Sequence, residues 1–276
     1  MNRRDLLKQT GVSVATMAAL PLLGSQLQAD EVWVRIQKLS WAGVKIETIS
    51  TSILIDPWVS TDSFGNDWKN PVVPIEVANK LRYVLITHLH NDHFDPAAIR
   101  SVAKETGFSV ICWAPKAAGP ASRGLRTYPV QMHEPITLGD VTLWPVPAVD
   151  GVQGVNIQVS WIVTAGNKRF IHCGDTLWHG GFWDIGVQYG PFDIAFLPIN
   201  GATIKGRVPE SGIAISMNPT EAIAAGMVMK AKMIVPIHYG VSGEGYVEHP
   251  NALAEFQSQA RSRSQNVRIL KDGEIL

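Results

Sequence analysis

The chain has 276 residues, of which 46% are hydrophobic, and its 24 basic and 24 acidic side chains cancel. That length and apolar fraction suffice for one large domain with a sizeable core, which excludes a wholly disordered chain. The balanced charge lacks the basic surface that nucleic-acid binding requires. Cys112 and Cys173 are too few for a disulfide scaffold, and both lie in apolar runs where we expect free buried thiols.

The first 29 residues have the layout of an export signal. Asn2-Arg3-Arg4-Asp5 precedes an apolar stretch over residues 11–24, and Leu27-Gln28-Ala29 ends it with a small residue. This order is typical of a signal peptide, and the paired arginines resemble a twin-arginine signal. The apolar part is shorter than the roughly 20 residues that cross a bilayer. We therefore expect the twin-arginine machinery to export the chain, and cleavage near Ala29 to release residues 30–276 into the periplasm; a retained N-terminal anchor is the alternative.

Alternating apolar and β-branched residues predict strands in the first half of the chain. Residues 34–49 and 52–55 read as paired strands, and residues 60–74 read as a loop because they are rich in Gly, Asn, Asp and Pro. Trp58, Phe64 and Trp68 beside this loop either face a ligand or pack the loop itself. Residues 82–87 predict a further strand, Asp95 caps a helix that Gly107 closes, and residues 108–113 predict the next strand.

The second half repeats this organisation. Strands are predicted at residues 141–146, 155–164, 169–172, 193–198 and 233–237, and a closing strand at 267–270. Helices are predicted at residues 252–260 and 219–229, where Asn218 caps the helix and Glu221 completes a capping pattern. Two β-rich halves, each covered by helices, predict an α/β fold, a four-layer αββα sandwich that occupies residues 30–276 as one domain.

A dense cluster of metal-competent side chains follows the strand at residues 82–87. His88-Leu89-His90-Asn91-Asp92-His93 places four such side chains within six residues. At an extended strand end, residues 88 and 90 project to the same side, so both imidazoles can bind one ion. After a turn, Asp92 and His93 can reach a second ion. Neutral imidazoles with a carboxylate suit zinc and other divalent first-row ions.

This cluster resembles the metal motif of the metallo-β-lactamase superfamily. The resemblance implies further ligands at Asp175 in Gly174-Asp175-Thr176, whose carboxylate would bridge two ions, and at His238, which would bind the second ion. It covers most of residues 33–275. Ile55-Asp56-Pro57-Trp58 and Met217-Asn218-Pro219-Thr220-Glu221-Ala222 place it nearest the branch that contains L-ascorbate-6-phosphate lactonase and N-acyl-phosphatidylethanolamine phospholipase D.

One position departs from that family pattern. Members of the superfamily usually carry a histidine after the strand at 141–146, where this chain has Pro147-Ala148-Val149-Asp150-Gly151. We expect Asp150 to be the third ligand of the first ion, which would favour manganese or iron(II) over zinc because a carboxylate is a harder ligand. The alternative is that Asp150 is only a loop residue.

The remaining basic side chains divide by context. His179 follows the predicted bridging aspartate closely and is a candidate for substrate contact, whereas His172 is a core or supporting residue, and His133 and His249 read as surface residues. Lys205 and Arg207 are candidates for holding a phosphate or carboxylate of an anionic substrate. Solvated loop charges are the alternative for this pair.

The expected chemistry is metal-dependent hydrolysis of a small molecule. Two divalent ions, zinc or else manganese or iron(II), would lower the pKa of a shared water so that hydroxide attacks an ester, lactone or phosphodiester, and Asp92 would orient that nucleophile. Two alternatives remain open. One is a metal-binding protein in which Asp150 has altered catalysis, and the other is a di-iron oxidoreductase of the same fold, although His90 occupies the position where those proteins carry glutamate.

Overall fold

Several strands carry consecutive apolar side chains, so they need cover on both faces. In β11 (Ile194–Pro198), Ile194 and Phe196 enter one core while Ala195 and Leu197 enter another. A strand that is apolar on both faces must be buried between two layers. The computed structural model, which describes residues 33–79, 81–103, 109–152 and 157–276, shows these layers as parts of one compact unit.

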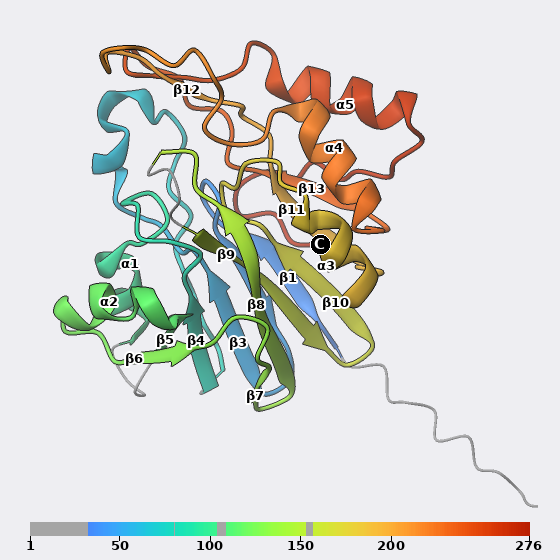
Figure 1. Ribbon diagram of the computed structural model, residues 1–276. Coiled ribbons are helices and arrows are strands. Elements are labelled where there is room, and N and C mark those ends of the chain that lie inside the picture. Colours follow the sequence, from blue (N-terminus) through green and yellow to red (C-terminus); the bar gives the residue numbers. More distant parts are fainter. Residues whose placement is uncertain (1–32, 80, 104–108, 153–156) are drawn as a thin grey trace, which may run out of the picture. The chain divides into compact units, whose positions relative to one another are not determined.

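Two large sheets form the centre of the fold (Figure 1). The first contains, in spatial order, β1 (Arg35–Lys38), β2 (Val44–Glu47), β3 (Thr51–Ile55), β4 (Leu81–Leu85), β5 (Ser109–Trp113) and β6 (Thr127–Val130). The second contains β13 (Ile234–Ile237), β11, β10 (Lys168–His172), β9 (Ile157–Ala165), β8 (Val141–Val149) and β7 (Ile136–Leu138). A separate pair, β12 (Thr203–Ile204) and β14 (Tyr246–Val247), is antiparallel.

Three apolar cores separate four layers. The largest lies between the two sheets and includes Ile53 and Trp161, one from each sheet. The outer face of the first sheet packs on α1 (Pro96–Ala103) through Ile99 and Val102, and α2 (Ala118–Ser122) lies on the same side (Figure 1). The second sheet is covered by α3 (Gly181–Gln188), α4 (Pro219–Val228) and α5 (Ala252–Ser262). The predicted α/β four-layer αββα sandwich is confirmed.

The predicted helix starts are confirmed by their capping bonds. Asn218 accepts a hydrogen bond of 3.0 Å from the amide of Glu221, whose carboxylate accepts one of 2.9 Å from the amide of Asn218. One oxygen of Asp95 accepts from the amides of Ala97 and Ala98 at the start of α1. Its other oxygen accepts from the amides of Val59 and Ser60, each at 2.8 Å, and so ties the loop between β3 and β4 to the start of the helix. That loop contains the short 3-10 helices η1 (Thr61–Ser63) and η2 (Gly65–Asp67), and a third, η3 (Ala114–Lys116), precedes α2.

The predicted closing strand at residues 267–270 is wrong. Val267 makes only an isolated bridge with Ile234 of β13, an edge strand of the second sheet. The chain then crosses to the first sheet, where the amide of Leu276 donates to the carbonyl of Ile36 in edge strand β1. A segment that bridges the edges of two sheets cannot follow either one as a strand. Of the predicted helix that Gly107 closes, the described part is α1, because residues 104–108 lie outside the described residues. The helices α2 and α3 and the strands β6, β7, β12 and β14 were not predicted.

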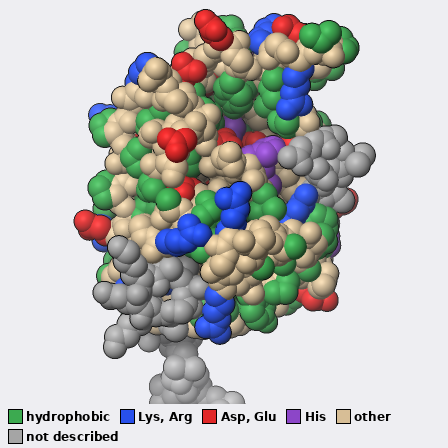
Figure 2. All heavy atoms as spheres, turned by 90° about the vertical axis from the view of Figure 1, so that its left-hand side faces the viewer, with side chains coloured by type: hydrophobic (Ala, Val, Ile, Leu, Met, Phe, Trp, Pro, Cys, Tyr) green, Lys and Arg blue, Asp and Glu red, His purple; other side chains and the backbone are tan. Residues whose placement is uncertain are grey.

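The carboxyl ends of the parallel strands bring the predicted ligands together. Parallel pairing joins β3 with β4, β10 with β11, and β11 with β13. Asp56 follows β3, His238 follows β13, and the segment that contains His88 follows β4. Figure 2 shows histidine side chains inside a hollow on one face, with acidic side chains beside them. The predicted signal peptide, residues 1–29, lies outside the described residues, and no helix within the described part is long and apolar enough to span a bilayer.

Candidate metal centre

A buried network holds the residue before the histidine cluster. Asp56 accepts hydrogen bonds from the amide of Thr87 at 2.8 Å and from its hydroxyl at 2.6 Å. Because the Thr87 proton is committed to Asp56, its oxygen can only accept from Nδ1 of His88, at 3.0 Å. His88 then keeps the lone pair on Nε2, the nitrogen that faces the cluster.

A glycine completes the turn beside this network. Gly174 has φ +60°, and a Cβ at this position would lie 2.9 Å from the Thr87 hydroxyl oxygen. Both features require glycine, since other residues are strained at this φ and a side chain would collide with Thr87. The close approach of the two segments places Asp175, the next residue, against the histidines.

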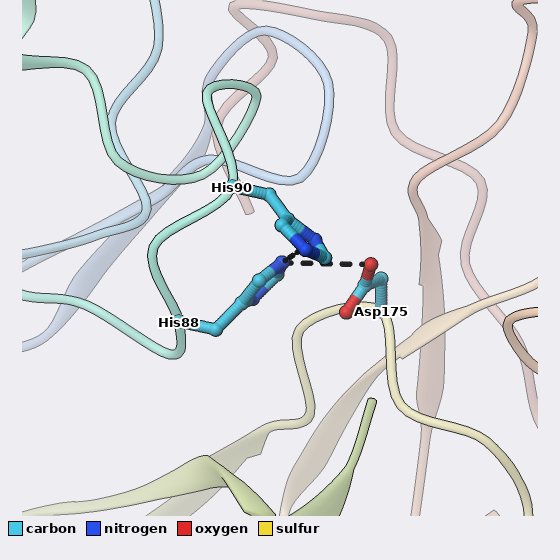
Figure 3. Close-up of side chains that lie close together, drawn as sticks. All are labelled: His88, His90 and Asp175. Atoms are coloured by element: carbon cyan, nitrogen blue, oxygen red, sulfur yellow. Dashed lines mark hydrogen bonds and ion pairs between the residues drawn. The ribbon is translucent and has the colours of Figure 1, made fainter. Parts of the chain in front are cut away.

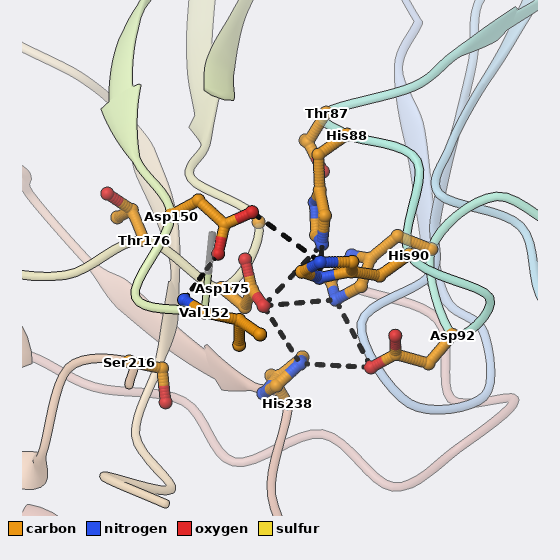
Figure 4. Close-up of polar contacts among 12 residues, drawn as sticks. Thr87, His88, His90, Asp92, Asp150, Val152, Asp175, Thr176, Ser216 and His238 are labelled. Carbon is orange, nitrogen blue, oxygen red and sulfur yellow. Dashed lines mark hydrogen bonds and ion pairs between the residues drawn. The ribbon is translucent and has the colours of Figure 1, made fainter. Parts of the chain in front are cut away.

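The first group of ligand atoms belongs to His88, His90 and Asp175, and these atoms lie within 4.8 Å of one another (Figure 3). Nε2 of His88 lies 3.6 Å from Oδ2 of Asp175 and 2.9 Å from Nδ1 of His90. Asp150 joins them, because its Oδ2 lies 3.5 Å from Nε2 of His90 while its Oδ1 accepts from the amide of Val152. The Asp150 side chain is buried and turned toward His90 (Figure 4), which supports its assignment as a ligand over the loop alternative.

The second group of ligand atoms belongs to Asp92, His93 and His238. Oδ2 of Asp92 lies 3.5 Å from Nε2 of His93 and 3.4 Å from Nε2 of His238. The two groups share one atom, Oδ2 of Asp175, which lies 3.6 Å from His88, 3.9 Å from His93 and 4.0 Å from His238 (Figure 4). A single carboxylate oxygen therefore faces both groups.

The distances and the bonding of these atoms fit metal ions. Ligands of a tetrahedral zinc ion at its usual bond lengths lie about 3.3 Å apart. The separations of 3.4–3.6 Å between imidazole and carboxylate atoms in both groups are close to this value and longer than normal hydrogen bonds, whereas the two nitrogens of His88 and His90 lie at 2.9 Å. Nε2 of His93, Nε2 of His238 and Oδ1 of Asp175 are buried and have no hydrogen-bond partner among the described residues. Buried polar atoms are nearly always paired, so these residues fit a cation that would complete their bonding.

Comparison with known proteins identifies the family. Residues 51–239 match the Beta-lactamase superfamily domain. A UPF0173 metal-dependent hydrolase of Thermococcus kodakarensis is 31% identical over 211 residues, which cover 75% of this chain and 84% of that protein. The chain belongs to the metallo-β-lactamase superfamily. The resemblance to the lactonase and phospholipase branch remains a prediction within it.

Solved structures of the superfamily share the fold. Igni18, a metallo hydrolase from Ignicoccus hospitalis, superposes with a TM-score of 0.64 at 21% identity, covering 88% of this chain and 97% of that one. CmlA, a diiron β-hydroxylase from Streptomyces venezuelae, gives a TM-score of 0.69 at 13% identity, covering 88% of this chain and 54% of that one. Identities this low relate the folds alone.

The close packing of imidazoles and carboxylates in this superfamily member shifts the pKa values of His88, His93 and Asp56. Burial disfavours ionisation of Asp56, but the hydrogen bond from His93 and the nearby imidazoles outweigh it and lower the pKa of Asp56. Burial likewise works against a charged His93, yet Asp92, Asp56 and Asp175 raise its pKa to about 9. Burial, followed by the nearby imidazoles of His93 and His90, lowers the pKa of His88 well below its usual value. With no ion bound, His93 is therefore a cationic imidazolium at neutral pH, whereas His88 is a neutral imidazole whose one ring proton is on Nδ1.

Two further side chains support the ligands from behind. The indole of Trp41 donates to Oδ2 of Asp92 at 3.0 Å. His172 bonds the carbonyl of Ala42 at 2.7 Å and accepts from the amide of Gly174 at 3.2 Å, so it supports the turn that carries Asp175. Of the two alternatives for His172, the structure favours a supporting role. Nothing in the sequence pointed to Trp41, whereas Asp56 was noted only as part of the Ile55-Asp56-Pro57-Trp58 motif and was given no role at the site.

A cavity of about 270 Å³ is lined in part by residues of both ligand groups. Its wall contains the ligand candidates His90, Asp92, Asp175 and His238, and the side chains Ser63, Phe64, Asn91, Val152, Ile204, Ile215 and Tyr246. Phe64 therefore faces the candidate site, whereas Trp58 is buried in the core between the sheets. Trp68 lines a different pocket.

The three predicted substrate contacts lie away from the described wall of this cavity. His179 stacks on Phe182 with ring centroids 4.1 Å apart, and burial lowers its pKa to about 4. Lys205 and Arg207 are exposed, and Lys205 pairs with Glu210 at 3.3 Å. The exposed positions of Lys205 and Arg207 match the alternative that they are solvated loop charges. His133 bonds the Tyr189 hydroxyl, and His249 faces Glu255.

The predicted free thiols are confirmed. Cys112 and Cys173 are both buried and unbridged. Burial raises the pKa of each thiol to about 12. Neither thiol is therefore a nucleophile at neutral pH.

Proposed function

We propose that this chain is a metal-dependent hydrolase that holds two divalent ions in one cavity and cleaves an uncharged ester or lactone. The observation that carries the proposal is Oδ2 of Asp175, which faces both ligand groups within 4.0 Å. A shared carboxylate oxygen is the feature expected of a two-ion centre. The relatives named metal-dependent hydrolases support the reaction class.

Each residue of the cluster has a task in this proposal. His88, His90 and Asp150 would hold the first ion, Asp92, His93 and His238 would hold the second, and Asp175 would be shared by the two positions. Bound divalent ions supply Lewis-acid activation of water and of the bond to be cleaved. Asp92 also lines the cavity, and we assign it the further task of orienting the attacking water by accepting a hydrogen bond.

The ligand set bears on the identity of the ions. Each position combines two imidazoles with carboxylates, since Asp150 stands where relatives carry a histidine and Asp175 is shared. Zinc tolerates such a set, and manganese or iron(II) prefers it over one rich in imidazole. We propose two divalent ions, zinc or one of these harder ions.

The cavity wall supports an uncharged substrate over a phosphodiester. Phe64, Val152, Ile204, Ile215 and Tyr246 present apolar or aromatic surface, and no lysine or arginine lines the described part of the wall. Residues 153–156, outside the described part, are Gln-Gly-Val-Asn and carry no charge. Only the two ions would balance the charge of an anionic substrate on the described wall, whereas an ester or lactone with an apolar substituent also fits its apolar surface.

A panel of substrates tests this proposal directly. Protein stripped by chelation and reconstituted with zinc, manganese or iron(II) would be assayed on phenyl acetate, δ-valerolactone, bis(p-nitrophenyl) phosphate and a β-lactam. We expect hydrolysis of the ester or lactone that vanishes on chelation and returns with metal. Asp175→Ala should abolish it, while the exposed Asp184→Ala should not. Equal activity of Asp175→Ala and the parent protein would reject the two-ion centre.

The two alternatives give other results on the same panel. A metal-binding protein without catalysis would retain stoichiometric metal yet turn over none of these substrates. An oxidoreductase, as the fold similarity to the diiron β-hydroxylase CmlA suggests, would consume oxygen in the iron form. His90 supports the hydrolase, because the first motif of those oxidoreductases resembles His-x-Glu-x-Asp.

We further propose that the twin-arginine machinery exports the chain to the periplasm. The support is the sequence of residues 1–29, with Arg3-Arg4, an apolar stretch and Ala29. Replacing Arg3 and Arg4 with lysine should retain the full-length protein in the cytoplasm. Fractionation and N-terminal sequencing of the exported product would check both the route and cleavage near Ala29.

A further inference from the structure

Tyr246 lies in the cavity wall on the short strand β14, which follows the ligand candidate His238 in the sequence. Because β14 pairs with β12, Tyr246 stands opposite Ile204, another wall residue. Its ring lies 6.1 Å from that of Phe64. The two-stranded sheet therefore places a phenol in a wall that also contains Asp92 and Asp175.

A buried polar chain ends at this phenol. The Ser216 hydroxyl donates to Oδ1 of Asn200, and Nδ2 of Asn200 donates to the phenol oxygen of Tyr246. Asn200 is fully buried and Ser216 is 1% exposed. The backbone of Asn200 is also held, because its carbonyl accepts from the amide of His249 at 2.7 Å. Since Ser216 occupies the amide oxygen, the amide nitrogen is the group turned toward Tyr246.

The polarity of this chain leaves the phenol proton for the cavity. An oxygen that already accepts a hydrogen bond becomes a stronger donor, because neighbouring hydrogen bonds polarise one another. The phenol is protonated at neutral pH, because the ordinary pKa of a tyrosine is about 10. It shares the cavity wall with the ligand candidates Asp92 and Asp175.

We propose that Tyr246 donates a hydrogen bond to the substrate oxygen on which negative charge develops during hydrolysis, and that Ser216 and Asn200 are positioning residues for its phenol. The proposal rests on the proposed ester or lactone hydrolysis, in which that oxygen is the carbonyl oxygen. No proton leaves the phenol. A preorganised donor aimed at a developing charge stabilises the transition state more than the bound substrate.

The experiment uses a ligand that needs no turnover. Methyl phenylphosphonate is a monoanion with the tetrahedral shape of the transition state for ester hydrolysis, and its affinity for the metal-loaded protein would be measured by calorimetry. Tyr246→Phe should weaken binding by about 10- to 100-fold, the range for a hydrogen bond to a charged group. Tyr128→Phe is the matched control, because Tyr128 is exposed on β6, and it should leave the affinity unchanged.

Ser216→Ala keeps the phenol and removes only its support, so we expect a smaller loss than in Tyr246→Phe with unchanged metal content. Where an ester is turned over, Tyr246→Phe should lower kcat and leave KM nearly unchanged. Unaltered phosphonate affinity in Tyr246→Phe overturns the proposal, as does a parent protein that does not bind the phosphonate. If Tyr246→Phe loses its metal, Ser216→Ala decides, and unaltered affinity in that variant is the contrary result. A phosphonate difference without hydrolysis of any ester or lactone would reject the proposed function and keep the hydrogen-bonding role of Tyr246.

Discussion

The indole of Trp41 and the carboxylate of Asp92 share a 3.0 Å hydrogen bond that ends on the same oxygen facing His93 and His238. The Trp41 ring also lies 4.2 Å from the ring of His238. Trp41 itself sits at φ 59° in a turn closed by the bond from the amide of Leu39 to the carbonyl of Gly43. A strained turn thus presents the indole to two ligand candidates at once.

Replacing Trp41 with phenylalanine should weaken binding at the second ion position by about 10- to 100-fold, as is usual when a partner of a metal ligand is lost. The lost hydrogen bond frees Asp92 from one orientation. Competition with a chelating dye would measure the affinity. Trp144→Phe is the control, because Trp144 is partly buried and packs on the core between the second sheet and its helices. This variant should bind metal as the parent does. Equal affinities for the two variants would count against the link between Trp41 and Asp92.

Replacing Asp150 with histidine should shift metal retention toward zinc. The change exchanges a hard carboxylate beside His90 for a third imidazole, which suits zinc better than manganese. Metal content after growth with both ions would be measured by mass spectrometry. Asp150→Asn, which removes the charge without adding an imidazole, should lower retention of the first ion for either metal. An unchanged zinc to manganese ratio in Asp150→His would refute the assignment of Asp150 as a ligand.

Metal uptake at pH 7 should release a proton from His93. Its pKa in the metal-free protein is raised to about 9, so the imidazole is protonated at pH 7 and must become neutral to bind an ion. The apparent affinity should therefore rise with pH until about pH 9 and then level off. Calorimetry in two buffers of different ionisation enthalpy would count the protons. Identical binding enthalpies in both buffers would contradict the raised pKa.

Replacing Gly174 with alanine should destabilise the fold by about 1–3 kcal/mol, the usual cost of an L-residue in the left-handed region. The added methyl group would also press on Thr87 at 2.9 Å, and so disturb the network that orients His88. Urea denaturation would give the change in the free energy of unfolding. Gly180→Ala is the control, because no atom lies within 4 Å of its added Cβ and its φ is −62°. Comparable stability of the two variants would show that the Gly174 turn tolerates a side chain.

Much of the fold could be predicted because its signals are local. The cap of α4 is written in Asn218 and Glu221, three residues apart, and the strand leading to the histidines is a short apolar run. The closing strand failed for the opposite reason. Residues 267–270 resemble a strand in composition, but Val267 and Arg268 meet the second sheet at the single residue Ile234, and the chain then moves to the first sheet, which residues 273–276 contact. Composition does not record this change of sheet.

The sequence by itself determined the dense histidine and aspartate motif, the layered α/β architecture and the departure at Asp150, because each depends on residues close together in the chain. Only the tertiary structure decided that one oxygen of Asp175 faces both ligand groups, that Trp41 supports Asp92, and that Lys205 and Arg207 lie away from the described cavity wall. It also brought Ser216, Asn200 and Tyr246 into one hydrogen-bonded chain. These contacts join distant segments, and their geometry follows from how two sheets pack and where their parallel strands end.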